Sequence, residues 1–255
     1  MTDQISTFEY HNGELFCESV PVRAIAESCG TPTYIYSARA FRERYRKISS
    51  AFSAWKPVVC YSIKCCANLS ILKLLAEEGS GFDIVSGGEL YRALLAGARP
   101  ETIVFAGVGK TDQEIEFALQ EGILLFDVES RPEMEQIDRI ARRLGVRAKA
   151  AIRLNPDVDA HTHKKTTTGK AEAKFGIGIQ ETESLFEETA SWTGVDVVGI
   201  HLHLGSPIHS TKPYEHALEI TVGLVERLRE AGHAVEYINM GGGYCISYTG
   251  EDVIG

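Results

Sequence analysis

The chain has 255 residues, enough for one large α/β domain or two small ones. Its net charge of −9 argues against nucleic acid or an anionic membrane surface as a partner. No apolar run reaches membrane-spanning length and residues 1–4 show no signal-peptide pattern, so we expect a cytoplasmic protein. The cysteines form no C-x-x-C pair, and we expect reduced thiols.

Residues 1–36 are expected to form a small N-terminal segment of their own. Asn12-Gly13 separates two strand-like runs, which is the strongest short-range signal for a β-hairpin. A lone hairpin is marginal in water, so we expect it to dock on another sheet, in a β domain. Val22–Cys29 then predicts a short helix, and Thr33–Tyr36 predicts a further strand.

From Ser37 onward, strand-like runs alternate with helical ones, beginning with a helical stretch up to Trp55. This alternation predicts βαβ units and a parallel sheet. A (β/α)8 barrel over residues 37–255 is the first interpretation, and an open doubly wound sheet is the second. The predicted strands are Val58–Lys64, Gly81–Val85, Ile103–Ala106, Ile123–Val128, Arg147–Leu154, Val195–Leu204 and Val235–Met240. Because a closed barrel needs an eighth strand, we expect the chain to be part of a longer protein.

Three of the predicted helices begin with a capping-box pattern. The pairs are Ser86 with Glu89, Thr111 with Glu114, and Ser130 with Glu133. The stretch Gly107–Thr111 looks like the tail of a phosphate-binding P-loop. However, Val104 occupies the place of the first glycine, so a turn into the helix capped by Thr111 is the better interpretation.

The first predicted strand ends in a lysine, Lys64. Side chains alternate along a strand, so Lys64, Ser62 and Cys60 would share one face, which we assign to the barrel interior. A buried or half-buried lysine loses hydration, its pKa falls, and its amine becomes a competent nucleophile. Such an amine can hold pyridoxal phosphate as a Schiff base. The alternative is a lysine that extends from the strand end into water.

Other polar residues lie at or near the same end of different predicted strands: Asp83, Glu89, Arg153 and His203. Each could belong to an ordinary surface ion pair, but charged groups collected at this end of a barrel favour catalysis. Gly241-Gly242-Gly243 follows the last predicted strand, and Ser206 follows the one before it. Glycines let backbone N–H groups approach an anion closely, so these residues predict a phosphate site.

His201 and His203 alternate on one predicted strand, so both would point the same way. With His161 and His163 they could form a zinc site, although no carboxylate or cysteine has matching spacing. An imidazole at the top of a barrel can instead stack on an aromatic cofactor ring, and His201 fits a hydrogen-bonded core histidine equally well. Asn155–Gly176 is a long polar connection on the predicted active face, and such loops are often functional.

Several of these segments together resemble the barrel-type pyridoxal phosphate-dependent decarboxylases. They are Tyr61-Ser62-Ile63-Lys64, Asp83–Glu89, Lys174-Phe175-Gly176, His201–Ser206 and Gly241-Gly242-Gly243. The opening Gly13–Cys17, Phe105–Thr111 and Asn155–Asp159 are most similar to the branch of the family that acts on diaminopimelate. The resemblance covers nearly the whole chain.

The resemblance implies a role for each motif residue. Lys64 would form the Schiff base with pyridoxal 5′-phosphate, and Asp83 and Glu89 would orient it. Arg153 would face the phenolic oxygen of the cofactor, and His203 would stack on its pyridine ring. The phosphate would be held by Ser206, Gly241, Gly242 and Gly243. The family's acidic motif on the eighth strand and its C-terminal β domain do not occur before Gly255.

The implied activity is decarboxylation of meso-2,6-diaminopimelate to L-lysine and carbon dioxide, the last step of lysine biosynthesis, by a homodimer. One alternative is a decarboxylase of another basic amino acid (ornithine, arginine or carboxynorspermidine type) on the same fold. The other is a pyridoxal phosphate-binding protein without catalysis. Metal, nucleic-acid and membrane partners are not expected.

Overall fold

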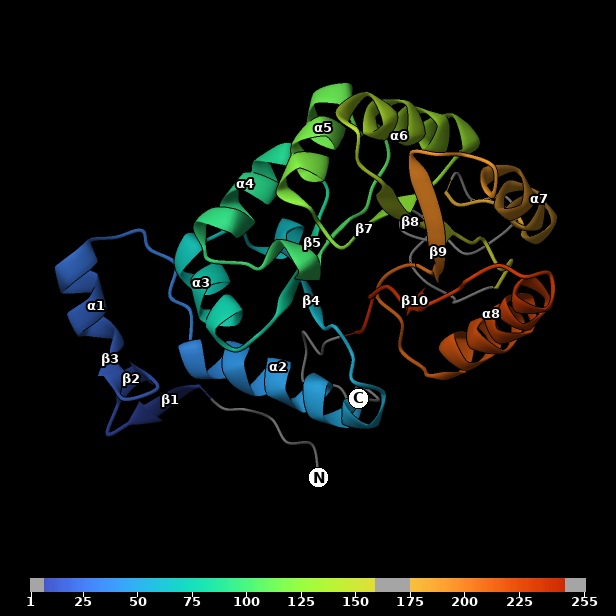
Figure 1. Cartoon of the computed structure of the whole chain (residues 1–255). Coiled ribbons are helices and arrows are strands. Elements are labelled where there is room, and N and C mark those ends of the chain that lie inside the picture. Colours follow the sequence, from blue (N-terminus) through green and yellow to red (C-terminus); the bar gives the residue numbers. More distant parts are fainter. Residues whose placement is uncertain (1–6, 159–174, 246–255) are drawn as a thin grey trace. The chain divides into compact units, whose positions relative to one another are not determined.

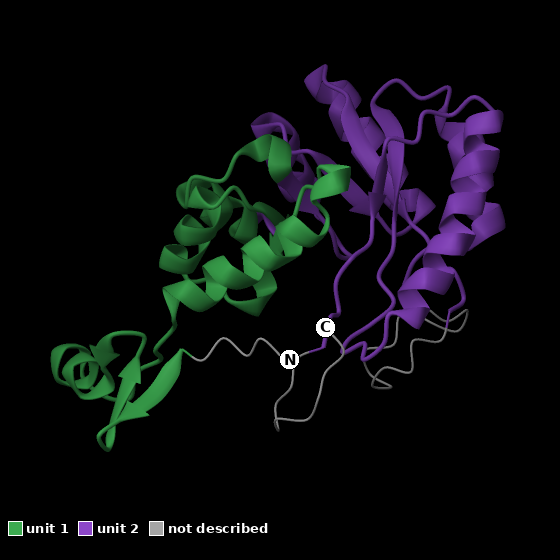
Figure 2. Ribbon diagram, turned by 90° about the horizontal axis from the view of Figure 1, so that it is seen from below, with its two compact units in different colours: residues 1–83, 88–102 green, residues 84–87, 103–255 purple. Residues whose placement is uncertain are grey.

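The computed structural model of the chain describes residues 7–158 and 175–245. The chain divides into two compact units, drawn in different colours in Figure 2. Unit 1 comprises residues 1–83 and 88–102, and unit 2 comprises residues 84–87 and 103–255. The boundary crosses one strand and the helix that follows it, so the units share a continuous backbone there.

The N-terminal part of unit 1 is a small antiparallel sheet followed by a helix. Its elements are β1 (Phe8–His11), β2 (Glu14–Cys17), β3 (Val20–Pro21) and α1 (Val22–Cys29). Asn12 and Gly13 have φ angles of 51° and 83°, the pair of positive values that a two-residue type I′ hairpin needs. The predicted hairpin and the predicted helix are both confirmed.

The strand predicted at Thr33–Tyr36 is wrong. These residues form no regular element, and the side chains of Tyr34 and Tyr36 are exposed. Threonine and tyrosine favour strands only where a neighbouring strand is available for pairing, and none of the described strands pairs with this segment.

The rest of unit 1 alternates helices with two parallel strands. It contains α2 (Ala38–Ala51), η1 (Ser53–Trp55), β4 (Cys60–Ser62), η2 (Ile63–Cys65), α3 (Leu69–Glu77), β5 (Gly81–Ile84), α4 (Gly87–Leu95) and η3 (Pro100–Thr102). Ser37 caps α2 and Asn68 caps α3 through side-chain oxygens that accept backbone N–H groups. β4 and β5 pair so that Ser62 lies opposite Asp83.

Unit 2 continues the alternation. Its elements are β6 (Ile103–Phe105), α5 (Asp112–Glu121), β7 (Leu125–Val128), α6 (Arg131–Leu144), β8 (Ala148–Arg153), α7 (Ile179–Thr189), β9 (Val195–His201), α8 (Lys212–Glu230) and β10 (Tyr237–Asn239). Consecutive strands from β6 to β10 pair in parallel. The Ala106 N–H donates to the Ile84 carbonyl at 2.9 Å, which joins β5 to this series.

The parallel sheet therefore contains seven strands whose order, β4 to β10, follows the chain (Figure 1). This confirms the predicted α/β fold class, an incomplete barrel-type series of seven strands. Each predicted strand is found, and each is shorter than the range predicted from the sequence. The run extends further than the pairing because residues just outside a short strand can still be buried by flanking helices.

The core of unit 2 lies between its strands and helices. β7 is buried along its whole length, and the rings of Phe105 and Phe126 stack with centroids 6.0 Å apart. α5 and α6 lie side by side (Figure 1). α6 buries Met134, Ile137 and Ile140 completely, and each such side chain contributes about 1.5–3 kcal/mol relative to exposure.

The long connection after β8 is fastened at both ends. The Asn155 N–H donates to the Ile177 carbonyl, and the Ile177 N–H donates to the Arg153 carbonyl, both at 2.8 Å. Leu154 and Ile177 thereby form an isolated parallel bridge. Most of the connection, residues 159–174, lies outside the described residues.

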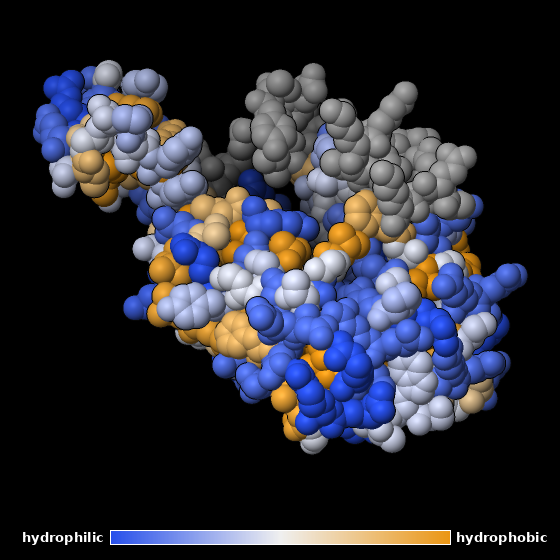
Figure 3. Space-filling model, turned by 90° about the horizontal axis from the view of Figure 1, so that it is seen from above, coloured by the Kyte–Doolittle hydropathy of each residue, from blue (hydrophilic) through white to orange (hydrophobic). Residues whose placement is uncertain are grey.

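On the face drawn in Figure 3, hydrophobic residues are interspersed with hydrophilic ones. Among the described residues, no helix has both the length and the apolar character needed to cross a membrane.

Glu114 links the starts of two helices. Its Oε2 accepts the Thr111 N–H at 3.0 Å and completes the predicted capping box of α5, while its Oε1 accepts the Gly87 N–H at the start of α4 at 2.8 Å. Burial alone would raise the pKa of Glu114. The hydrogen bonds from Gly87 and Thr111 outweigh burial and hold this pKa below its ordinary value of 4.5.

We predict that Glu114→Gln lowers the free energy of unfolding by about 1–2 kcal/mol at neutral pH, because an amide offers only one acceptor atom where the carboxylate offers two. A lowered folded-state pKa contributes stability that is present above 4.5 and is lost as the pH falls through the folded value. The difference between variant and unmodified protein should therefore shrink in acid. Urea titrations over a pH series measure it. Glu116→Gln, which removes a surface partner of Arg143 on the same helix, is the control. A difference that stays constant with pH would contradict this role.

Candidate cofactor site

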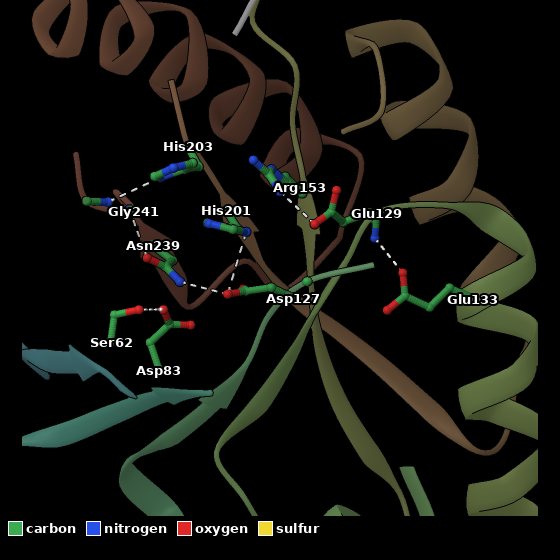
Figure 4. Close-up of polar contacts among 12 residues, drawn as sticks. Ser62, Asp83, Asp127, Glu129, Glu133, Arg153, His201, His203, Asn239 and Gly241 are labelled. Carbon is green, nitrogen blue, oxygen red and sulfur yellow. Dashed lines mark hydrogen bonds and ion pairs between the residues drawn. The ribbon is translucent and has the colours of Figure 1, made fainter. Parts of the chain in front are cut away.

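The predicted site residues of unit 1 follow β4 and β5. Lys64 lies in the turn η2 directly after β4, and its side chain is exposed. Asp83 is half-buried on β5, where its Oδ2 accepts the Ser62 hydroxyl at 2.7 Å (Figure 4). Glu89 is half-buried in the first turn of α4. Asp83 is thus hydrogen-bonded to Ser62, which lies two positions before Lys64.

The placement of Lys64 corrects the sequence interpretation. We expected it on a strand, buried or half-buried, on the same face as Ser62 and Cys60. The strand ends at Ser62 because β4 pairs with β5 over only Cys60–Ser62, and the backbone then tightens into η2. The alternation of side chains between the two faces of β4 stops before Lys64. Lys64 therefore lies beyond the carboxyl end of the strand, where its side chain is exposed.

In unit 2, the carboxyl ends of neighbouring strands carry a group of polar side chains. The group consists of Asp127 and Glu129 at the end of β7, Arg153 at the end of β8, His201 at the end of β9 and Asn239 at the end of β10 (Figure 4). Parallel strands end at the same edge of a sheet, so the topology alone collects these groups. This edge is where ligands bind in parallel α/β folds.

Arg153 is buried and paired. Its Nη1 donates to Glu129 Oε1 at 2.6 Å, and the exposed fractions of the two side chains are 9% and 4%. The guanidinium also lies over the Phe175 ring, 5.1 Å from the centroid. In the described part of the chain, no hydrogen bond engages Nε or Nη2. Arg153 is therefore held firmly at one nitrogen and keeps donors for an anionic oxygen.

Lys110 stabilises the same edge of the sheet through its ammonium group. Its Nζ donates to the carbonyls of Gly107 and Asp127 at 2.8 and 2.9 Å and to Glu133 Oε1 at 2.5 Å. All three ammonium protons are thus used, and only 1% of the side chain is exposed. This agrees with interpreting Gly107–Thr111 as a turn rather than a nucleotide site.

The capping box predicted for Ser130 and Glu133 is half formed. The Ser130 hydroxyl accepts the Glu133 N–H at 3.4 Å. The Glu133 carboxylate, however, accepts the Glu129 N–H at 2.9 Å and binds Lys110 instead of the Ser130 backbone. A buried ammonium group is a stronger partner for a carboxylate than one amide N–H.

The glycine triplet packs tightly against the segment that follows β9. A methyl group added at Gly241 would overlap the Leu202 carbonyl, and one added at Gly243 would overlap the Gly205 carbonyl. Both glycines also have positive φ angles, 67° and 94°. Gly242 differs, because nothing lies within 4 Å of the position a methyl group would take there. The triplet thus needs glycine at its ends for packing, while its middle faces open space.

One amide of the triplet is available for a ligand. The half-buried Tyr214 hydroxyl donates to the Gly242 carbonyl at 2.8 Å, and desolvation raises the pKa of Tyr214, which keeps the phenol protonated. Carbonyl and N–H point in opposite directions across a trans peptide, so the Gly243 N–H points away from Tyr214. Among the described residues, no hydrogen bond engages that N–H.

The two histidines occupy different environments. His201 is buried at the end of β9, with its Nδ1 3.5 Å from Asp127 Oδ2, which favours the core-histidine interpretation. His203 lies beyond the strand and is half-buried, and its Nδ1 accepts the Gly242 N–H at 3.5 Å. Because β9 ends at His201, the alternation of side chains along a strand does not apply to His203, and the two rings need not point the same way. No group of three metal-binding side chains occurs in the described residues, and His161 and His163 lie outside them.

The unit 2 residues fit a phosphorylated aromatic cofactor. An open loop middle with a free N–H suits a phosphate, Ser206 is half-buried directly after Gly205, and a half-buried imidazole next to the loop suits an aromatic ring. The structure brings His203 together with Gly241 and Gly242. It shows no contact between Arg153 and His203, and Arg153 lies opposite His201 in the strand register.

Sequence reasoning missed Asp127, Glu129 and Asn239. The signal was present, because Asp127 and Glu129 are charged residues two positions apart at the end of an apolar strand. Asn239 stands two positions before the glycine triplet. None of the three belongs to the motifs described above, and only strand pairing shows that they converge.

Three comparisons place the chain among known proteins. Residues 38–254 match the family model described as "Pyridoxal-dependent decarboxylase, pyridoxal binding domain". Diaminopimelate decarboxylases of Aquifex aeolicus and Pseudomonas aeruginosa are 45% and 43% identical over 96% and 97% of this chain. The chain spans 58% and 60% of their lengths.

The structural comparison agrees. Diaminopimelate decarboxylase from Helicobacter pylori, solved with L-lysine, superposes with a TM-score of 0.89 at 38% identity. The match covers 92% of this chain and 59% of that one. Since the family model covers most of the sequence and the fold superposes closely on a solved relative, the chain belongs to the pyridoxal-dependent decarboxylase family, of which it carries the pyridoxal-binding domain.

Proposed function

We propose that this chain is the cofactor-binding part of an enzyme that decarboxylates meso-diaminopimelate to L-lysine and carbon dioxide. The observation that carries the cofactor assignment is the glycine triplet, which packs against the end of β9 and faces open space at Gly242. The substrate assignment is supported by relatives of 42–45% identity that are named diaminopimelate decarboxylase. The predicted homodimer and the cytoplasmic location stay predictions.

The proposal gives each site residue one task. Lys64 carries the cofactor covalently, and its exposed amine beyond β4 is accessible to an aldehyde. Asp83 and Glu89 orient groups near Lys64. Arg153 offers its remaining donors to an anionic oxygen of the cofactor, and His203 stacks on its ring. Ser206, Gly241, Gly242 and Gly243 hold the phosphate.

When bound, pyridoxal phosphate supplies an electron sink for the electron pair that carboxylate loss leaves behind. The chain's residues supply binding and orientation. Arg153 remains a cation whose position is fixed by Glu129, and the fixed cation holds a negatively charged group without reorganising. The Lys64 amine, when not bonded to the cofactor, would hold or donate a proton at Nζ.

The first test is the site of covalent attachment. We expect borohydride treatment of the protein with pyridoxal phosphate to fix one cofactor on Lys64, as located by mass spectrometry. Lys64→Ala should abolish the label, whereas Lys56→Arg, at another exposed lysine, should leave it unchanged. A label on a different lysine would overturn the assignment.

The second test is the substrate. We expect carbon dioxide and L-lysine in equal amounts from meso-diaminopimelate, and a kcat/KM at least about a hundredfold lower for ornithine or arginine, since a site built for a second polar head rejects substrates lacking it. Faster release from ornithine or arginine would support the alternative substrate class. Full cofactor binding without carbon dioxide from any of them would show a binding protein.

The glycine triplet offers a matched pair of substitutions. Gly243→Ala should lower the free energy of unfolding by more than about 2 kcal/mol, because the added methyl meets a backbone carbonyl at a positive φ angle. Gly242→Ala should cost less than about 1 kcal/mol, because its methyl enters open space. If that space takes the phosphate, Gly242→Ala should still weaken pyridoxal phosphate binding. Thermal melting and cofactor titration measure the two effects, and equal loss of stability in both variants would refute the packing argument.

A further inference from the structure

Asp127 is a deeply buried polar group at the sheet edge, with a side chain that is 1% exposed. Its Oδ2 accepts the Asn239 Nδ2 at 2.9 Å and lies 3.5 Å from His201 Nδ1 (Figure 4). A buried carboxylate is costly unless its partners are specific. None of the tasks assigned above uses Asp127, so its presence needs an explanation.

We propose that Asp127 is a positioning residue that fixes the glycine triplet and the His203 ring through Asn239. The inference rests on the proposed cofactor site, and it assigns to Asp127 and Asn239 the control of that site's geometry. Neither side chain needs to touch the cofactor to act in this way.

The first step is the orientation of the Asn239 amide. A side-chain amide has a donor end and an acceptor end, and a carboxylate only accepts. Asp127 therefore selects Nδ2, which turns Oδ1 toward the glycine triplet. There, Oδ1 accepts the Gly241 N–H at 2.9 Å. With the amide reversed, two acceptors would face each other at Asp127 and two donors would face each other at Gly241.

The second step connects Gly241 to His203. Backbone bonds fix the start of the loop, since the Leu202 N–H donates to the Asn239 carbonyl at 2.7 Å. A methyl group at Gly241 would lie 3.1 Å from His203 Nδ1, so loop and ring are in contact. The next amide, Gly242 N–H, donates to His203 Nδ1. An Nδ1 that accepts leaves the neutral ring's proton on Nε2, so the Gly242 N–H, held in place through Gly241 and Asn239, selects a His203 tautomer.

A reciprocal exchange tests this relay. Asn239→Asp places two carboxylates face to face, and Asp127→Asn removes the charge that orients Asn239. In the double variant Asp127→Asn/Asn239→Asp, the amide at position 127 donates to the carboxylate at position 239, whose other oxygen still accepts the Gly241 N–H. We expect Asn239→Asp to raise the Kd for pyridoxal phosphate about tenfold or more and the double variant to return within about threefold of the unmodified protein, since residues in one network couple strongly.

A second readout needs no cofactor. Without pyridoxal phosphate, ¹⁵N NMR should show His203 of the unmodified protein with the proton on Nε2, and hydrogen exchange should show a protected Gly241 amide. Asn239→Asp should mix the tautomers and speed the exchange, and the double variant should restore both. The control is Thr221→Val, which removes a buried hydrogen bond to the Ala217 carbonyl in α8. It should lower the melting temperature and leave both readouts unchanged.

The outcomes separate the two proposals. If the protein binds no pyridoxal phosphate but the NMR and exchange pattern holds, the relay stands and the proposed function falls. If the cofactor binds and the double variant is no better than the worse single variant in either readout, the relay falls and the function stands. Should Asn239→Asp fail to fold, a folded double variant that binds the cofactor supports the relay, and an unfolded one refutes it.

Discussion

Parallel pairing of β7, β8, β9 and β10 is the constraint on which the unit 2 half of the proposed site depends. Each strand enters at one edge of the sheet and leaves at the other, so the residues that end the strands meet whatever their distance in sequence. Asp127 and Asn239 are separated by 112 positions and yet share a hydrogen bond. The apolar middle parts of the strands stabilise the sheet. Polar groups, which would be costly to bury in the core, lie at the strand ends.

Two carboxylates at this edge, Asp127 and Glu129, are buried and carry specific partners. Breaking a buried charged pair by removing one partner costs on the order of 3–5 kcal/mol. Moving Arg153 away from Glu129 during binding would incur much of that cost. The edge is therefore rigid before any ligand arrives, and such preorganisation reduces the ordering that binding itself must supply.

The sequence was sufficient for the order and type of elements because period and length distinguish buried strands from helices. The N-terminal hairpin, the helix Val22–Cys29 and the seven parallel strands were all predicted. Strand ends were predicted poorly, as Lys64 shows, because an apolar run records burial whereas a strand ends where pairing ends. The strand predicted at Thr33–Tyr36 was wrong for the same reason, because its strand-forming residues have no neighbouring strand to pair with.

Motif residues of the site were also readable, since glycine triplets and strand-end histidines have a recognisable chemistry. Asp127, Glu129 and Asn239 were not, because their role arises from pairing register between distant segments. A single sequence contains the residues but not the register. The half-formed capping box at Ser130 is similar: the competing partner, Lys110, lies far from it in sequence and reaches it only in the fold.

The fastened ends of the connection between β8 and α7 have a consequence for how this chain can vary. The hydrogen bonds among Arg153, Asn155 and Ile177 fix the end of β8 directly. The end of the strand therefore does not depend on the length of the segment between Asn155 and Ile177. Closing a loop twice as long costs only about 0.6 kcal/mol more. A change of length between the two hydrogen-bonded ends would leave intact the described bonds that position Arg153.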